Sequence, residues 1–354
     1  KWNAWRYLSM LGNTRTHIKN FVGNVGSITV SYVKDSVGTA IESSYNTIAK
    51  RMGKEQIQRT KAIVNPFSKA DQTILRATWT DFQNVYEVAT GTGKRNPANM
   101  IRDNMTIFKN QGKWGALETS PAVAKAVRTV SDQLNSFMET ARKANLNALE
   151  AADVLGLRTK YAQAMAGFVK ANNIPLEALE GKGIYNQARI DEGRAYAVVQ
   201  ALETTFRDRS ILAERLNNLK RSGKVAEVVG EGVLPFTKTP INITKRSVEY
   251  SPIGLGKTFI TESGKLKRGV ITPSQFIDNT SKGLTGTGIF LLGMFLASLG
   301  ILRSGGPEKD KEGRFEDLQG EQNYSINFGG HSYTLDWAAP AVIPLFSGAE
   351  LVQS

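Results

Sequence analysis

A run of twenty uncharged residues, GLTGTGIFLLGMFLASLGIL at positions 283–302, limits most strongly how this chain folds. A helix of twenty residues extends roughly 30 Å, about the thickness of the hydrocarbon core of a membrane. Only the stretch from Ile289 to Leu302 is strongly apolar, because Gly and Thr interrupt the first part. We expect Lys282–Arg303 to be helical. Three placements stay open: a permanent membrane span, a buried helix of a helical core, or a segment buried in one assembly and inserted in another.

Small residues within the run indicate where a second helix can approach. Gly293 and Ala297 stand four positions apart, a spacing that lets helix backbones pack closely in lipid. The residues predicted to contact lipid or a neighbouring helix are Ile289, Leu292, Gly293, Leu296, Ala297 and Leu299. Residues 238–303 hold nine basic and three acidic side chains, and residues 304–354 hold three and eight. In a span, the more basic side would face the cytoplasm.

Helix-start signals predict where two helices begin. Thr272, Pro273 and Gln275 form a capping-box pattern, so the helix that contains the run is expected to begin at Pro273. Ser68 predicts in the same way a helix over residues 69–89. Nearer the start of the chain, apolar residues at helical spacing predict two helices with a break at Gly12, where Asn13 or Thr14 can cap the second helix, which reaches about Val22. A third amphipathic segment is expected over residues 28–52.

The stretch YSINFGGHSYTLDW at positions 324–337 alternates between apolar and polar residues on both sides of Gly329–Gly330. Two glycines between alternating runs are typical of a β-hairpin. The expected fold class is therefore mainly α, multi-helical, with one long hydrophobic helix and a small C-terminal β-hairpin.

Composition shifts and prolines divide the chain into four expected segments. They are a basic helical N-terminal arm (1–62), an all-helical body (63–233), a Pro-punctuated segment with the hydrophobic helix (234–303), and a polar loop, β-hairpin and C-terminal helix (304–354). Because the first residue is Lys, we expect the chain to be a fragment or a processed product of a longer protein.

Positive charge indicates polyanionic partners. The formal net charge is +13, and residues 1–62 contain ten basic and three acidic side chains. A basic excess of this size favours nucleic acid or an anionic lipid surface. The residues predicted to bind nucleic acid are Arg6, Arg15, Lys19, Lys34, Lys50 and Arg51. Binding of this kind is independent of sequence and weakens with salt.

Catalytic and metal sites find little support in the residue types. The chain has no cysteine and two histidines, so thiol catalysis and thiolate metal sites are excluded. The stretch SPIGLGKT resembles the end of a phosphate-binding loop, but Ser251 stands where its first glycine is required. In VATGTGKR, Val88 replaces that glycine and Arg95 replaces the hydroxyl residue that would hold magnesium. We expect no catalytic residues, no metal and no cofactor.

Three segments carry a resemblance to a known group of proteins. WRYLSMLGNTRTHIKNFVGN, LPFTKTPINITKRSVEYSPIGL and GRFEDLQGEQNYSINFGGHSYTLDWAAPAVIPLFSGAE resemble parts of the large polyvalent proteins of bacteriophages and conjugative elements, and of related virion-associated proteins. The resemblance covers about 80 residues, towards both ends of the chain. It implies a protein that travels with the DNA into the recipient cell, and no catalytic residue.

The combined expectation is a non-enzymatic structural protein of a phage virion, internal or ejected with the DNA and able to meet a membrane on delivery. Its expected partners are other virion proteins, DNA, the host membrane and further copies of the chain. The expected locations are the virion interior and, after delivery, the host envelope or cytoplasm. Two alternatives remain: a structural linker module of a mobile-element polyprotein, and a soluble nucleic-acid-binding protein.

Overall fold

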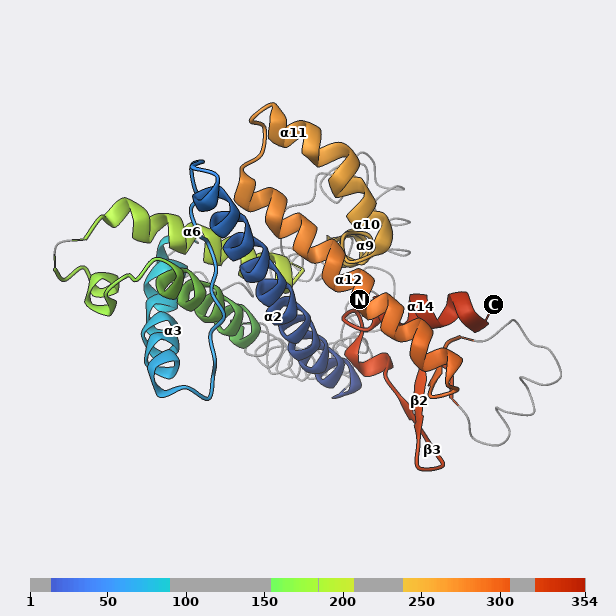
Figure 1. The fold of residues 1–354 in the computed structure, drawn as a ribbon. Helices are drawn as coiled ribbons and strands as arrows, with labels where there is room; N and C mark the ends of the chain where they lie inside the picture. Colours follow the sequence, from blue (N-terminus) through green and yellow to red (C-terminus); the bar gives the residue numbers. More distant parts are fainter. Residues whose placement is uncertain (1–13, 90–153, 184, 207–237, 306–321, 354) are drawn as a thin grey trace, which may run out of the picture. The chain divides into compact units, whose positions relative to one another are not determined.

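A computed structural model describes residues 14–89, 154–183, 185–206, 238–305 and 322–353 (Figure 1). Contacts divide the chain into two compact units, residues 1–22 with 83–156 and residues 23–82 with 157–354. Most of the described residues belong to the second unit, and the core and site contacts below lie within it. Residues 23–62, expected in an N-terminal arm, are part of this unit.

Helices dominate the described residues, and a small antiparallel sheet lies near the C-terminal end. The helices are α2 (Thr14–Arg51), α3 (Lys69–Ala89), a helix over residues 154–171, η2 (Leu176–Glu180), α6 (Gln187–Thr204), α9 (Lys238–Glu249), α10 (Pro252–Lys257), η3 (Thr258–Glu262), α11 (Ser263–Lys267), α12 (Pro273–Ser298), η4 (Asp336–Ala338) and α14 (Ile343–Gln353). The strands are β1 (Leu302–Arg303), β2 (Ser325–Phe328) and β3 (His331–Thr334), in that order across the sheet. The predicted mainly α class with a C-terminal hairpin is confirmed.

The helix α2 corrects one expectation. The sequence predicted one helix from about Thr14 to Val22 and a separate segment from Ile28, but α2 is continuous from Thr14 to Arg51. The predicted start near Thr14 is confirmed. Two glycines within this stretch, Gly23 and Gly26, permit close packing. A Cβ atom at Gly23 would lie 2.7 Å from the carbonyl oxygen of Ala339, so the missing side chain lets the backbones touch.

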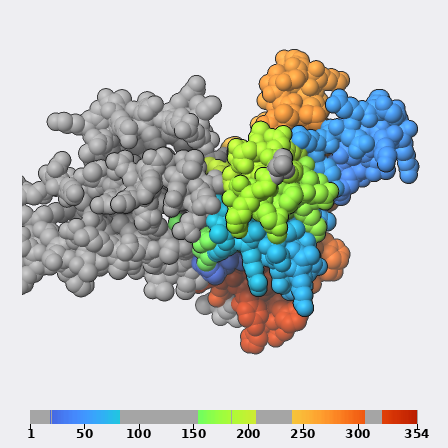
Figure 2. All heavy atoms as spheres, turned by 90° about the vertical axis from the view of Figure 1, so that its left-hand side faces the viewer, coloured from blue at the N-terminus to red at the C-terminus, as the bar shows by residue number. Residues whose placement is uncertain are grey.

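The main core is built around the helix over residues 154–171. Its Tyr161, Met165 and Phe168 side chains are wholly buried. Tyr161 donates a hydrogen bond of 2.6 Å to Asp81 of α3, and Arg194 of α6 donates to the same carboxylate at 2.6 Å. Figure 2 shows α6, in yellow-green, directly beside α3, in cyan. These contacts hold three helices that are distant in sequence against one another.

The start of α12 is as predicted. The Thr272 side chain accepts a hydrogen bond from the Gln275 backbone, and the Gln275 side chain accepts one from the Thr272 backbone, with Pro273 in the first turn. The capping box is therefore confirmed. The predicted helix over 69–89 is also confirmed, because α3 spans Lys69–Ala89.

The end of α12 differs from the expectation that Lys282–Arg303 forms one helix. The helix ends at Ser298, Gly300 adopts a left-handed φ of 70°, and Leu302 pairs with Ile326 in the sheet. A glycine in this conformation is a common way to end a helix. Leu302 is wholly buried in a small C-terminal core with Ala297, Phe346 and Ala349, and this burial holds the chain in the strand.

The long hydrophobic helix is likewise not found. The first half of α12 carries Asp278, Ser281 and Lys282 on its buried face, so only the second half is strongly apolar. Among the described residues, none of the helices combines the length and the apolar character that crossing a membrane requires.

The hairpin follows the alternating pattern. In β2 and β3, Ser325 pairs with Thr334 and Phe328 pairs with His331, and Gly329 and Gly330 form the turn with φ values of 61° and 78°. Glycine is favoured there because both turn residues need positive φ. The strand β1, which adds to the hairpin at β2, was not predicted from the sequence.

Candidate functional site

The basic residues predicted to bind nucleic acid are divided by the fold. Lys50 and Arg51, in the last turn of α2, are exposed, and Lys19 is partly exposed. Arg15 lies in α2, and Arg6 lies outside the described residues. Contacts of these five residues with nucleic acid stay predictions.

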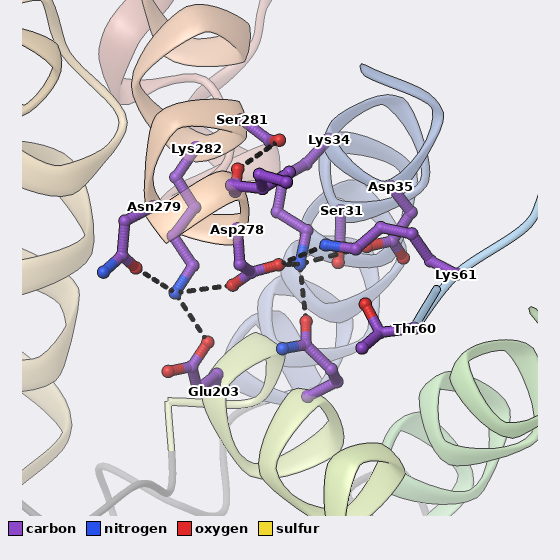
Figure 3. A network of polar contacts seen from close by, with 12 residues as sticks. Ser31, Lys34, Asp35, Thr60, Lys61, Glu203, Asp278, Asn279, Ser281 and Lys282 are labelled. Atoms are coloured by element: carbon purple, nitrogen blue, oxygen red, sulfur yellow. Dashed lines mark hydrogen bonds and ion pairs between the residues drawn. The ribbon is translucent and has the colours of Figure 1, made fainter. Parts of the chain in front are cut away.

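Lys34 is buried, so its predicted contact with nucleic acid is wrong. Its side chain is 1% exposed, and its Nζ lies 3.0 Å from Oδ1 of Asp278 in α12 and 3.0 Å from Oδ1 of Asp35 (Figure 3). The Nζ also donates a hydrogen bond of 2.5 Å to Gln200 of α6. The ammonium group is therefore used inside the protein.

Asp278 is the centre of this arrangement. Its Oδ1 lies 3.0 Å from the Nζ of Lys34 and 2.8 Å from that of Lys61, and its Oδ2 lies 3.2 Å from the Nζ of Lys282 (Figure 3). The three lysine side chains are between 1% and 6% exposed. One carboxylate thus joins α2, the segment after α2 and α12.

The ion pairs continue on both sides of Asp278. On one side, Lys160 contacts Asp35 at 2.5 Å. On the other side, Glu203 of α6 contacts Lys282 at 2.8 Å and Arg246 of α9 at 3.4 Å. We call the connected residues the buried ion network: Lys34, Asp35, Lys61, Lys160, Glu203, Arg246, Asp278 and Lys282.

Glu42 positions the segment that carries Lys61. Its side chain is wholly buried and accepts hydrogen bonds from the Thr60 hydroxyl at 2.6 Å, the Thr60 backbone at 3.2 Å and the Lys61 backbone at 3.4 Å. These hydrogen bonds replace the water that burial removes from the carboxylate. This contact fixes the path of the chain after α2, so the Lys61 side chain reaches Asp278.

Mutual attraction overcomes the effect of burial at the centre of the network. Burial alone would raise the pKa of Asp278, but Lys34, Lys61 and Lys282 outweigh it and hold that pKa well below its usual range. Burial alone would lower the pKa of Lys34, but Asp278 and Asp35 hold it well above. Burial alone would also lower the pKa of Lys282, but Asp278 and Glu203 outweigh it and raise that pKa. These groups are therefore charged at neutral pH.

The edge of the network contains one exception. Burial lowers the pKa of Lys160 below its usual value, although Asp35 partly offsets the effect. Asp35 itself has a pKa lowered to about 2, because Lys160 and Lys34 outweigh its burial. Burial therefore has the larger effect on Lys160, and ion pairing has the larger effect on Asp35.

At its centre, the network acts as a structural joint. A lysine acts as a nucleophile or a base only when its amine is neutral, which needs a lowered pKa. Lys34 and Lys282 have raised pKa values, and their ammonium groups are held by carboxylates. The arrangement instead connects α2, α6, α9, α12 and the helix over 154–171 through direct charge contacts.

Acid should weaken this joint. A carboxylate with a lowered folded-state pKa contributes stability above its ordinary pKa of about 4, and loses it as the pH falls through the folded-state value. For Asp35, the shift from 3.8 to about 2 corresponds to roughly 2 kcal/mol. Asp278 and Glu203 are shifted in the same direction. We expect the free energy of unfolding, from urea denaturation, to fall between about pH 4 and pH 2.

A variant pair checks this assignment. Asp35→Asn should be less stable than the wild type at neutral pH and should lose less stability on acidification, because one shifted carboxylate is gone. Asp191→Asn is the matched control, since the Asp191 side chain is 60% exposed and forms a surface ion pair with Arg194. An Asp35→Asn protein with the same acid dependence as the control would contradict the role of Asp35.

A small cavity lies beside the network, between α2, α6 and α9. Its volume is about 50 Å³, and Lys34, Glu203 and Lys282 are among its lining residues. Ser27, which is 8% exposed, also lines it, and its hydroxyl has no hydrogen-bond partner among the described residues. Burial raises the pKa of Tyr250, which also lines the cavity, to about 12. The space is sufficient for about three water molecules.

The residues predicted for helix packing fall on two faces of α12. Gly293 and Ala297 are buried, and Leu296 packs against the C-terminal core. A Cβ atom at Gly293 would lie 1.9 Å from the carbonyl oxygen of Leu345, so this glycine lets α14 touch α12. Ile289 is partly buried. The remaining two, Leu292 and Leu299, are 49% and 54% exposed.

The buried ion network was missed from the sequence. A usable local signal was the pair Asp278 and Lys282, four positions apart just before the uncharged run. Such a pair is usually assigned to a solvated helix face, because Lys and Asp are rarely fully buried. No sequence pattern near Asp278 and Lys282 indicates that they contact Lys34 or Glu203.

Among the described residues, no group of three His, Cys, Asp or Glu side chains is placed to hold a metal ion. Comparison with protein-family models, curated proteins and solved structures finds no match for this chain.

Proposed function

We propose that this chain is a non-enzymatic structural protein of a bacteriophage particle, carried inside the particle or ejected with the DNA. Its proposed partners are other virion proteins, further copies of the chain, and DNA bound without sequence preference. The observation that carries the proposal is the outer face of α12, which is apolar although it is exposed.

Six positions define this face, which we call the α12 outer stripe: Leu284, Gly288, Leu291, Leu292, Phe295 and Leu299. The five large side chains are between 40% and 58% exposed. At 3.6 residues per turn, the six positions lie within an arc of about 100°. They therefore form one continuous surface along the helix.

The opposite face of α12 is mainly polar or small. Gly286, Gly293 and Ala297 lie there in close contact with other segments, and Asp278 and Lys282 belong to the buried ion network. An ordinary surface helix has the reverse arrangement, with its apolar side chains inside. A contiguous exposed apolar surface usually marks an interaction site. The distribution on α12 thus supports a role in assembly.

The buried ion network supports the same role. It connects five helical segments through pairs such as Lys34 with Asp278 and Glu203 with Lys282. Breaking a buried pair strongly destabilises a protein, so these contacts resist local opening. A rigid body that presents an apolar stripe is suited to repeated assembly contacts.

Exposed positive charge supports the DNA part of the proposal. Lys50, Arg51 and Lys54 are exposed around the end of α2, and the whole chain carries a net charge of +13. Contacts of this kind bind phosphates without reading sequence. The alternatives are a linker module of a mobile-element polyprotein and a soluble nucleic-acid-binding protein without an assembly role.

Cross-linking of intact, purified particles of the encoding element, followed by mass spectrometry, tests the proposal. We expect peptides of this chain in the particles, protein cross-links near α12, and DNA cross-links near Lys50 and Arg51. A non-structural protein of the same element serves as the control for contamination. Absence of the chain from particles, with the chain present in the producing cells, would reject the virion role in favour of the alternatives.

A further inference from the structure

The order of side chains along the α12 outer stripe is symmetric about its centre. Leu291 and Leu292 are at the middle, Gly288 and Phe295 are the next positions outward, and the outermost positions hold leucine. A stripe with this order matches itself when a second copy is laid alongside in the opposite direction.

The register of that pairing follows from the spacing. With a twofold axis between positions 291 and 292, Leu291 of each copy faces Leu292 of the other copy. Position 284 then faces position 299, and Phe295 faces Gly288. The largest side chain of the stripe therefore meets the smallest, and a Cβ atom built at Gly288 has no atom within 4 Å, so room is present.

The α12 outer stripe lacks the charge that would oppose a second copy. Each chain carries a net charge of +13, so like-charge repulsion opposes contact through most of its surface. Residues 283–302 contain no charged side chain. The α12 outer stripe is therefore a surface where two equally charged chains can approach without placing like charges together.

We propose that two copies of this chain associate through an antiparallel α12–α12 contact, with Phe295 of each copy over Gly288 of the other. This pairing deepens the proposed function, since it rests on the α12 outer stripe being an assembly surface. A twofold axis makes the contact self-complementary, as in most homodimers. The stripe is about 22 Å long, from position 284 to position 299. A single helix pair of this length is smaller than a standard stable interface, so we expect micromolar affinity.

Sedimentation of the full chain at protein concentrations from about 1 to about 100 µM tests the association. We expect a reversible monomer–dimer equilibrium. Leu291→Lys should weaken it by at least about thirtyfold, because two like charges would meet at the axis. Ile260→Lys is the matched control, since Ile260 is 83% exposed but lies outside the stripe, in η3. Circular dichroism checks that both variants are folded.

The absence of cysteine allows a direct test of the register. Chains with Leu284→Cys are mixed with chains with Leu299→Cys and are oxidised. We expect disulfide-linked dimers in the mixture, and none from either variant alone, because like positions would be about 22 Å apart. Links within each single variant, without links in the mixture, would overturn the antiparallel register.

Two further outcomes would overturn the proposal. One is a monomer at every concentration, and the other is a dimer that Leu291→Lys leaves intact, which would place the contact elsewhere. A monomer that binds anionic vesicles in a Leu291-dependent way would assign the stripe to lipid instead. None of these outcomes decides whether the chain is present in particles, so failure of the dimer and failure of the virion role remain distinguishable.

Discussion

Asp278→Ala is expected to lower the free energy of unfolding of the full chain by about 4 to 5 kcal/mol, near the upper end of the range for broken buried ion pairs. The reason is the number of partners. Asp278 lies within 3.2 Å of the ammonium groups of Lys34, Lys61 and Lys282. Lys34 and Lys282 keep Asp35 and Glu203 as partners, but Lys61 has no other carboxylate within ion-pair distance among the described residues.

Urea denaturation followed by circular dichroism measures this loss. Asp191→Ala is the matched control and should change stability by less than about 1 kcal/mol, because its ion pair is exposed. Adding Lys61→Met to Asp278→Ala should recover part of the loss, since it removes the lysine left without a carboxylate. If Asp278→Ala is as stable as the Asp191→Ala protein, the buried ion network does not hold the fold together.

Gly293→Ala is expected to destabilise the protein by about 2 to 3 kcal/mol, although alanine is the better helix former. The added Cβ would lie 1.9 Å from the carbonyl oxygen of Leu345 and 2.8 Å from its carbonyl carbon. Both are backbone atoms of α14, so no side-chain rotation relieves the contact. The small core between α12 and α14 has to open to admit the methyl group.

Gly288→Ala is the control in the same helix. Open space surrounds Gly288, so this change should stabilise the helix by about 0.5 to 1 kcal/mol. Both proteins are compared by urea denaturation at concentrations well below the expected dimer dissociation constant, so that only intramolecular packing is measured. Equal stability of the two variants would show that α12 and α14 do not touch at Gly293.

Local signals were sufficient for several elements of the fold. The capping box at Thr272, Pro273 and Gln275 identified the start of α12, because its hydrogen bonds involve residues three positions apart. The glycine pair at 329–330 identified the hairpin in the same way, since a two-residue turn is set by its own φ values. Both features depend on neighbours in sequence, which a sequence displays directly.

The candidate site depended on distant partners and was not predicted. The Lys34 side chain is 1% exposed because Asp278 and Asp35 are beside it, and α2 alone does not show this. Part of the buried face of α12 was indicated by the pair Gly293 and Ala297, but its polar part, with Asp278 and Lys282, was not. Apolar side chains normally identify the inside of a helix, whereas here the glycines and the ion pairs do, because they contact segments elsewhere in the chain.

The separation between Lys34 and Asp278 has a consequence for how the chain is made. The two residues are 244 positions apart. At a synthesis rate of about 5 to 20 residues per second, Asp278 follows Lys34 by roughly 12 to 50 s. During that time, Lys34 lacks Asp278 and has only its sequence neighbour Asp35 as a carboxylate partner. We therefore expect the side of the nascent α2 that carries Lys34 to remain hydrated. A lysine that later forms buried ion pairs would then first help to keep the growing chain soluble.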